Sequence, residues 1–289
     1  MSDVTLLFGI GATKAGTSWL QFFLERHRDV HLWVHKELHY FDTLDEKNVM
    51  WQIDQLCEKR MGLRAKMKNG PDAETRKRLR FEVEEIDRWL GVLARDKEAP
   101  GAYMSFLKKG RAGKAVVGDI TPAYALLSEE RMKMMHGLNP TTKFVYLLRD
   151  PIQRLWSNIR MMAEWGGGSD KDMADRANWI FDRWLKGDEE ALGARCDYVG
   201  PLTRLTAAVP ETDRFIGFYE TLFTPETIRD LCSFIGIDQM DAPLERRVHA
   251  GVPIKMDATR RAIAAERLAP QYEFVQTMFG RMPERWSPA

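Results

Sequence analysis

The fold is decided by one stretch, residues 8–20, which reads FGIGATKAGTSWL. The apolar run at residues 4–10 predicts a short buried strand, and the apolar spacing that follows the turn predicts a helix. A strand, a glycine-rich turn and a helix N-terminus bring free backbone N–H groups and the positive end of the helix dipole to one place. Lys14 adds a positive charge, and Thr17 and Ser18 add hydroxyl donors. The stretch therefore predicts a site for a phosphate or a group built like one.

The position of the lysine argues against an ordinary nucleotide loop. The Walker A pattern places a lysine directly after its second glycine. Here Thr17 follows Gly16, and Lys14 comes two residues before that glycine. The dinucleotide pattern G-x-G-x-x-G also fails, because Lys14 stands at its third glycine position. A tight strand-to-helix connection without a ligand is the alternative for this turn taken alone.

The composition predicts a soluble α/β protein of the reducing cytoplasm. The chain has 289 residues, and its 43 basic and 42 acidic side chains argue against nucleic-acid binding through bulk charge. Its three cysteines lack the spacing of a metal site or a disulfide framework, so we expect no metal. The first predicted strand begins within a few residues, and no window approaches about 20 apolar residues. We therefore expect neither a signal peptide nor a membrane span.

A second cluster of reactive side chains follows the next predicted strand, at residues 30–34. Residues 35–42 read HKELHYFD, and charged residues between aromatics just past a strand end suit a site. Glu37, His39 and Asp42 converge if this segment is irregular, and a carboxylate beside an imidazole is a general-base arrangement. A surface loop with solvated charges is the alternative.

The composition changes after residue 44, where β-branched runs give way to Met, Arg, Lys and Glu. Apolar residues recur at helical spacing across residues 74–93, under a charged face. We therefore expect a helical insertion between strands of the sheet, at about residues 44–110.

Two further strands are predicted to end in polar residues at the same edge of the sheet. Residues 114–119 read KAVVGD and lead through a Thr-Pro turn to Tyr124. Residues 143–148 read KFVYLL and end at Arg149, where an Asp-Pro pair is typical of a helix start. Ligands of open α/β sheets bind at the carboxyl ends of strands, so Arg149 is placed to meet a phosphate. A structural ion pair is the alternative for this arginine.

The rest of the chain predicts helices around one more strand. We expect helices at residues 174–185, 198–209 and 225–235, a strand at residues 213–220, and one or two helices at the C-terminus. Two loops are expected beside the site, a glycine-containing loop at residues 164–172 and a basic loop at residues 246–257. Together the elements predict one α/β domain over residues 1–289, a P-loop-like three-layer fold with a central, mostly parallel sheet flanked by helices.

Two stretches, in this order, resemble the sulfotransferases that use 3′-phosphoadenosine 5′-phosphosulfate (PAPS). Residues 11–20, GATKAGTSWL, resemble their 5′-phosphosulfate loop, in which the lysine comes two residues before the glycine. Residues 149–157, RDPIQRLWS, resemble their 3′-phosphate motif, in which the arginine and the serine eight residues later hold the phosphate. Residues 218–236 resemble a later strand-helix segment of the family. The resemblance covers most of the chain outside the helical insertion and implies a single sulfotransferase domain.

Within that superfamily, the motifs are most similar to the heparan-sulfate type. That resemblance implies that Glu37 is the catalytic base, with His39 and Asp42 shaping the acceptor site. As a separate hypothesis, His39 is the alternative base. The Lys-Thr/Ser-Pro segment of that type is matched with Ile120 in place of the lysine, and Tyr124 is expected to bind the acceptor.

The resemblance also implies how the donor is held. Lys14 would stabilise the leaving phosphate while a hydroxyl or amine of a small-molecule or saccharide-like acceptor receives the sulfuryl group. The product of the donor would be 3′-phosphoadenosine 5′-phosphate. The residues expected to bind PAPS are Lys14, Ala15, Gly16, Thr17, Ser18, Trp19, Arg149 and Ser157.

Two other functions stay open at this point. A P-loop-like nucleotide kinase would need a nucleotide triphosphate and Mg²⁺, and the displaced Lys14 counts against it. A non-catalytic nucleotide-binding module has no use for a base beside the anion, so Glu37 and His39 count against it. The sequence leaves open the acceptor, the choice between O- and N-sulfation, and the formation of a homodimer.

Overall fold

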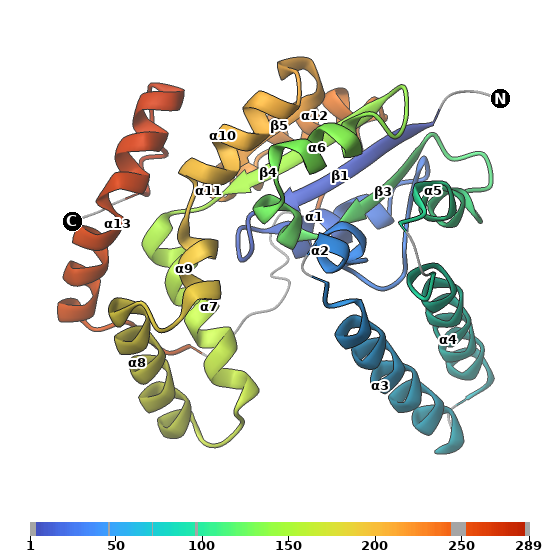
Figure 1. Ribbon diagram of the computed structural model, residues 1–289, viewed down its shortest axis with the longest axis horizontal. Coiled ribbons are helices and arrows are strands. Elements are labelled where there is room, and N and C mark those ends of the chain that lie inside the picture. The colour runs from blue at the N-terminus through green and yellow to red at the C-terminus, as the bar shows by residue number, and fades with distance from the viewer. Residues whose placement is uncertain (1–3, 46, 71, 96–97, 244–252, 287–289) are drawn as a thin grey trace.

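A five-stranded sheet forms the centre of the protein (Figure 1). The computed structural model describes residues 4–45, 47–70, 72–95, 98–243 and 253–286. The strands pair in the order β2-β3-β1-β4-β5, and every pairing is parallel. They are β1 (Thr5–Gly11), β2 (Val30–Leu32), β3 (Val116–Ile120), β4 (Thr142–Leu148) and β5 (Arg214–Phe218). The predicted fold class, a parallel sheet flanked by helices, is confirmed.

The middle strand, β1, is buried along almost its whole length. Leu7 pairs with Gly118 on β3, and Phe8 pairs with Phe144 on β4. A parallel strand that is covered on both faces has no polar side to show, so it appears in the sequence as a continuous apolar run. That is why residues 4–10 and 143–148 are recognisable as strands without a helical or alternating pattern.

The connections that follow β1 and β4 lead toward opposite edges of the sheet. The connection after β1 runs through α1 (Thr17–Glu25) to the edge strand β2, whereas the connections after β3 and β4 run the other way. In open α/β sheets, ligands bind outside the carboxyl ends of the strands at such a switch point. The loops that follow β1 and β4 flank this point.

Helices cover both faces of the sheet. Because crossovers between parallel strands are right-handed, α1 lies on one face and the helices whose connections run the other way lie on the opposite face. On that opposite face, α6 (Glu129–His136) packs against α10 (Val199–Ala208). The remaining helices outside the insertion are η1 (Pro122–Leu126), α7 (Pro151–Trp165), α8 (Asp170–Lys186), α9 (Glu190–Cys196), η2 (Glu211–Asp213), α11 (Tyr219–Leu222), α12 (Pro225–Ile235) and α13 (Ala258–Phe279).

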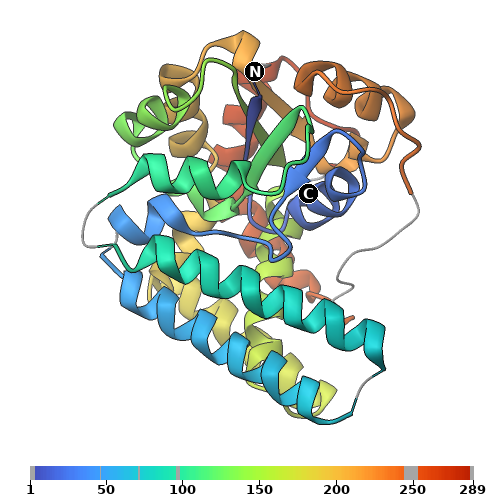
Figure 2. The ribbon, with the colours of Figure 1, turned by 90° about the vertical axis from the view of Figure 1, so that its right-hand side faces the viewer.

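The predicted helical insertion is present between β2 and β3. It contains α2 (Tyr40–Asp45), α3 (Val49–Lys68), α4 (Ala73–Leu93) and α5 (Pro100–Lys108). Figure 2 shows α3 and α4 lying side by side as a long antiparallel pair. Among the described residues, no helix combines the length and the apolar character that a membrane crossing requires.

Helix caps account for most of the predicted boundaries. The side chains of Ser128, Asp150 and Thr224 accept hydrogen bonds from backbone N–H groups in the first turns of α6, α7 and α12. A capping box between Ser169 and Asp172 begins α8 earlier than predicted, so the expected glycine loop shrinks to residues 166–169. Of the basic loop expected at residues 246–257, residues 246–252 lie outside the described residues.

Two other segments differ from the sequence expectation. The short helix α9 is missed because its seven residues bury only Leu192 and Cys196, too few to establish a helical period. The C-terminal segment forms one helix, α13, which continues through Pro270.

Gly9 gives a test of how tightly β1 and β3 pack. A Cβ at this position would lie 2.6 Å from Cδ1 of Ile120. We therefore expect Gly9→Ala to lower the free energy of unfolding by about 1–3 kcal/mol through overpacking, measured by urea denaturation. The matched control is Gly62→Ala in α3, where a Cβ meets nothing within 4 Å. Its better helix propensity should raise stability by about 0.5–1 kcal/mol, and equal effects at both positions would contradict the prediction.

Candidate active site

The loop between β1 and α1 has the backbone of an anion-binding turn. Lys14 and Gly16 adopt positive φ angles of 66° and 97°, with Ala15 between them. Such an alternation turns successive N–H groups toward one concave side. Within the described part of the chain, the N–H groups of Gly16, Thr17 and Ser18 donate no hydrogen bond to another protein group. These three free amides at the N-terminus of α1 are the groups that the predicted anion cradle would use.

Two residues of the loop are placed differently from the sequence prediction. The N–H of Ala15 donates to the carbonyl of Ala12 at 3.1 Å, and the N–H of Trp19 donates to the carbonyl of Gly16 at 3.0 Å. The Trp19 ring is buried and stacks on Phe23 with centroids 5.4 Å apart. The N–H groups of Ala15 and Trp19 are thus used inside the protein, and the donor-binding roles of these two residues stay predictions. Both hydrogen bonds stabilise the conformation of the loop.

The side chain of Lys14 lies among other positive charges. Its Nζ is 3.6 Å from Sδ of Met161 on α7. Burial lowers the pKa of Lys14, and the positive charges of Arg149, Arg160 and Lys36 lower it further. Like charges gathered in one place repel each other, so this group of cations gains most when a multiply charged anion binds among them.

Arg149 reaches the same loop from the end of β4. Its Nη1 donates to the carbonyl of Lys14 at 3.0 Å, and its guanidinium lies over the Tyr219 ring, 4.6 Å from the centroid. The structural ion pair that the sequence left open for Arg149 is not found among the described residues. Ser157 lies two turns along α7 and is 9% exposed.

Glu37, His39 and Asp42 converge as the sequence predicts. Nδ1 of His39 lies 2.6 Å from Oδ2 of Asp42, and Nε2 lies 3.3 Å from Oε2 of Glu37. The imidazole is thus held between two carboxylates. Glu37 is the more accessible of the two acids, with 35% of its side chain exposed against 9% for Asp42.

The two carboxylates set the charge of the cluster. Burial alone would lower the pKa of His39, but the hydrogen bonds with Asp42 and Glu37 outweigh it and raise the pKa to about 10. Burial alone would raise the pKa of Glu37, but His39 and Lys36 together lower it to about 2. At neutral pH the cluster therefore contains an ionised Glu37 and a protonated His39.

Lys36 connects this cluster to the anion cradle. Its Nζ lies 2.5 Å from Oε1 of Glu37 and 3.4 Å from Oγ1 of Thr17. No role is predicted for Lys36 from the sequence, although it stands directly beside Glu37. Ile120, which stands where the heparan-sulfate type has a lysine, is 2% exposed and packs over Gly9 in the core.

Tyr124 is a correction to the sequence prediction. Its side chain is fully buried, and its hydroxyl donates to Oδ2 of Asp119 at 2.7 Å and accepts the N–H of Tyr40 at 2.9 Å. Both capacities of the hydroxyl are used, so Tyr124 has no free group to offer an acceptor substrate. Its side chain belongs to the core behind the site.

The comparison with known proteins decides the family. The model described as "Sulfotransferase family" matches residues 7–241. The chain belongs to the sulfotransferase family. No curated protein sequence matches the chain significantly.

Solved sulfotransferase structures share the fold. A sulfotransferase from Alicyclobacillus acidocaldarius superposes with a TM-score of 0.63 at 18% sequence identity, covering 97% of both chains. The sulfotransferase domain of the Synechococcus PCC 7002 olefin synthase gives a TM-score of 0.54 at 14% identity, covering 97% of this chain and 95% of that domain. At these identities the similarity concerns the arrangement of sheet and helices.

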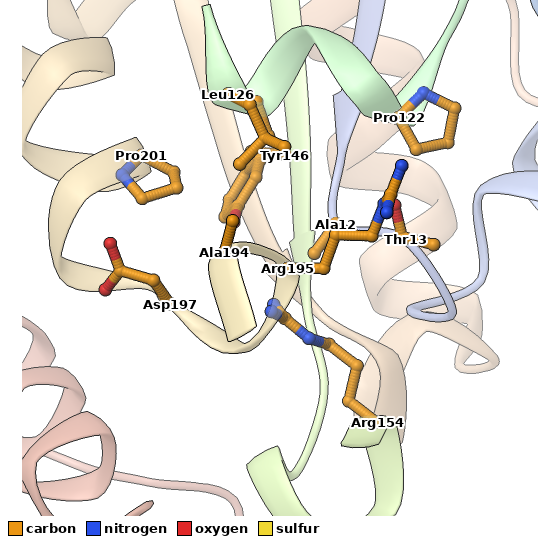
Figure 3. Close-up of a pocket in the computed structure, with 11 residues that line it drawn as sticks. Ala12, Thr13, Pro122, Leu126, Tyr146, Arg154, Ala194, Arg195, Asp197 and Pro201 are labelled. Carbon is orange, nitrogen blue, oxygen red and sulfur yellow. The ribbon is translucent and has the colours of Figure 1, made fainter. Parts of the chain in front are cut away.

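A small pocket opens beside the loop of this sulfotransferase, away from Lys14 and Glu37. Figure 3 shows Ala12, Thr13 and Arg154 around it. Arg154 is 3% exposed, and its guanidinium lies over the Tyr198 ring, 4.2 Å from the centroid. The second arginine of the RDPIQR segment therefore supports α7 from inside, whereas Arg149 faces the cradle.

The charge of His39 is open to measurement. We expect Asp42→Asn to lower the pKa of His39 from about 10 toward its ordinary value of 6.5, because it removes one of the two carboxylates that favour the imidazolium. An NMR titration of the imidazole signals measures it. Asp45→Asn, on the same helix, is the control, because Asp45 pairs with Arg131. A wild-type His39 that titrates near 6.5 would contradict the assignment.

Proposed function

We propose that the protein transfers the sulfuryl group of PAPS to a hydroxyl or amine of a small acceptor. The observation that carries the proposal is the position of Lys36, which contacts both Thr17 of the anion cradle and Glu37 of the carboxylate–imidazole cluster. An anion site and a proton acceptor that share one cation suit transfer of an anionic group to a protonated nucleophile.

The donor half of the proposed site is the loop after β1 with the end of β4. The free amides of Gly16, Thr17 and Ser18, together with the dipole of α1, suit a 5′-phosphosulfate group. Arg149 and Ser157, which belong to the same motif, would bind the 3′-phosphate. Two anionic groups on one nucleotide suit the cations that act on Lys14, which are Arg149, Arg160 and Lys36, with Glu164 as the opposing acid.

The transfer forms one bond and breaks one. The acceptor oxygen or nitrogen bonds to sulfur, the bond between sulfur and the 5′-phosphate oxygen breaks, and 3′-phosphoadenosine 5′-phosphate leaves. Lys14 would stabilise the charge that develops on the leaving oxygen, as cations do in phosphoryl transfer. The acceptor's proton would pass to the carboxylate of Glu37.

The environment of Glu37 changes when an anion binds. In the structure, Lys36 and His39 hold the pKa of Glu37 at about 2, which makes its carboxylate a weak base. A bound donor places negative charge beside Thr17 and competes for Lys36, and both effects raise the pKa of a nearby carboxylate. Glu37 is therefore a stronger base when the donor is present. The protonated His39 cannot accept a second proton, so it serves to hold Glu37.

The finer identity of the enzyme is part of the proposal. The similarity to the heparan-sulfate type depends on residues 37–42 and 120–124 and stays a prediction. So do the single domain over residues 1–289, the homodimer and the cytoplasmic location. We propose a small-molecule or saccharide-like acceptor.

Selectivity for the 3′-phosphate tests the donor assignment. We expect 3′-phosphoadenosine 5′-phosphate to bind more tightly than ADP in isothermal titration calorimetry, because Arg149 adds a charge-assisted contact. Arg149→Met should weaken this binding about 10- to 100-fold, as a lost hydrogen bond to a charged group does, and leave ADP unchanged. Arg229→Met, on the exposed face of α12, is the control. Equal binding of the two nucleotides to the wild type would overturn the assignment.

Substitution of Glu37 tests the proton acceptor. We expect Glu37→Gln to keep the affinity for 3′-phosphoadenosine 5′-phosphate and to lower kcat about 10²- to 10⁴-fold, the usual contribution of a general base. Transfer is followed with labelled PAPS and a panel of hydroxyl and amine acceptors. The exposed Glu226→Gln is the matched control. Unchanged turnover in Glu37→Gln would remove the role from this residue.

A further inference from the structure

A buried carboxylate lies directly behind the site. Asp119, at the end of β3, is 2% exposed and accepts hydrogen bonds from three side-chain hydroxyls. Oδ2 accepts from Tyr103 at 2.9 Å and from Tyr124 at 2.7 Å, and Oδ1 accepts from Thr121 at 2.6 Å. Three hydrogen bonds hold this buried carboxylate in one position.

Two of the three hydroxyls also hold the backbone of the segment that follows β2. The hydroxyl of Thr121 accepts the N–H of Leu38 at 3.0 Å, and the hydroxyl of Tyr124 accepts the N–H of Tyr40 at 2.9 Å. Leu38 and Tyr40 are the residues on either side of His39. The backbone N–H groups on both sides of His39 are thus held by Thr121, which follows β3, and by Tyr124 of η1.

The backbone around these anchors is in an unfavourable conformation. Glu37 and His39 have positive φ angles of 68° and 51°, in the left-handed region that residues other than glycine seldom adopt. A left-handed residue persists only where its surroundings determine its conformation. The anchored amides at Leu38 and Tyr40 alternate with the two left-handed residues.

The carboxylate decides the direction of these hydrogen bonds. A hydroxyl has one proton and can donate it to only one partner. Since Thr121 and Tyr124 donate hydrogen bonds to Asp119, each hydroxyl oxygen has a lone pair free to accept a hydrogen bond from a backbone N–H of the segment. Without the acid, the hydroxyls are free to rotate and the two amides lose a dedicated acceptor.

We propose that Asp119 is a positioning residue for the active site: through Thr121 and Tyr124 it fixes the backbone at Leu38 and Tyr40 and so aims Glu37 and His39. The effect on turnover rests on the proposed sulfuryl transfer, whereas the effect on His39 does not depend on it.

The third hydroxyl supplies a matched control. Tyr103 is fully buried and donates to the same Oδ2, yet among the described residues its hydroxyl holds no amide of the segment. Tyr103→Phe and Tyr124→Phe therefore each remove one phenolic hydroxyl and one hydrogen bond to Oδ2 of Asp119. Only Tyr124→Phe also deprives the N–H of Tyr40 of its acceptor.

The experiment compares Tyr124→Phe and Thr121→Val with Tyr103→Phe and Thr121→Ser. We expect the first two to lower kcat about 10- to 100-fold, the cost of a small displacement of a reacting group. Their affinity for 3′-phosphoadenosine 5′-phosphate should stay within about twofold, because the donor loop is untouched. The controls should keep kcat within about twofold, Thr121→Ser because it retains the hydroxyl.

The titration of His39 by NMR is the second readout. Among the described residues, the charged groups that act on His39 are Glu37 and Asp42, with Lys36 beyond Glu37 and the buried carboxylate of Asp119 behind the segment. When the segment is released, contact with both acids loosens, so the pKa of His39 should fall from about 10 in Tyr124→Phe and Thr121→Val and stay unchanged in both controls. This readout stands even if no acceptor is sulfated.

The outcomes separate the two proposals. An unchanged His39 in both test variants, or equal changes in Tyr103→Phe and Tyr124→Phe, would show that Asp119 only fills the core. A lowered pKa of His39 without any sulfuryl transfer by the wild type would support the positioning role and overturn the proposed function. Thr121→Val keeps the buried volume, so it gives the answer if loss of the Tyr124 hydroxyl unfolds the chain.

Discussion

The parallel pairing of β1 with β3 and β4 governs where every candidate group lies. Since the strands run in one direction, their carboxyl ends meet at one edge of the sheet and deliver Lys14, Asp119 and Arg149 there together. The pairing depends on close approach, because a Cβ on Gly118 would lie 2.9 Å from the carbonyl oxygen of Leu7. The chemistry of the site is thus a consequence of the hydrogen-bond ladder and of the glycines that permit it.

The charges at this edge are divided between two sides. Around the cradle, the pKa of Lys14 is lowered by burial and by neighbouring cations, so the positive charges on this side repel one another. On the other side, His39 is held between two acids in a favourable ion cluster. Lys36 belongs to both sides. Under the proposed function, binding of an anion would relieve repulsion on one side and weaken attraction on the other, and would so couple donor binding to the basicity of Glu37.

The sequence predicts those parts of the site that depend on local spacing. The turn with Lys14, the strand end with Arg149 and the convergence of Glu37, His39 and Asp42 follow from short segments whose geometry is fixed by strand, turn and cap. The motifs predict ligand contacts for Trp19 and Tyr124, whereas the structure buries both side chains. Whether such an aromatic side chain faces the ligand or the core depends on packing partners far along the chain, such as Phe223 for Trp19.

The role of Asp119 is hidden from the sequence for the same reason. Its partners come from α5, from η1 and from Thr121, which links β3 to η1, and the amides they anchor belong to a segment about 80 residues earlier in the chain. An irregular segment has no ladder of its own to satisfy its N–H groups, so side chains must do so. In this protein those side chains come from the neighbouring strand end. The residues at the end of β3 therefore fix the positions of Glu37 and His39, while the candidate reactive side chains lie on the segments after β1, β2 and β4.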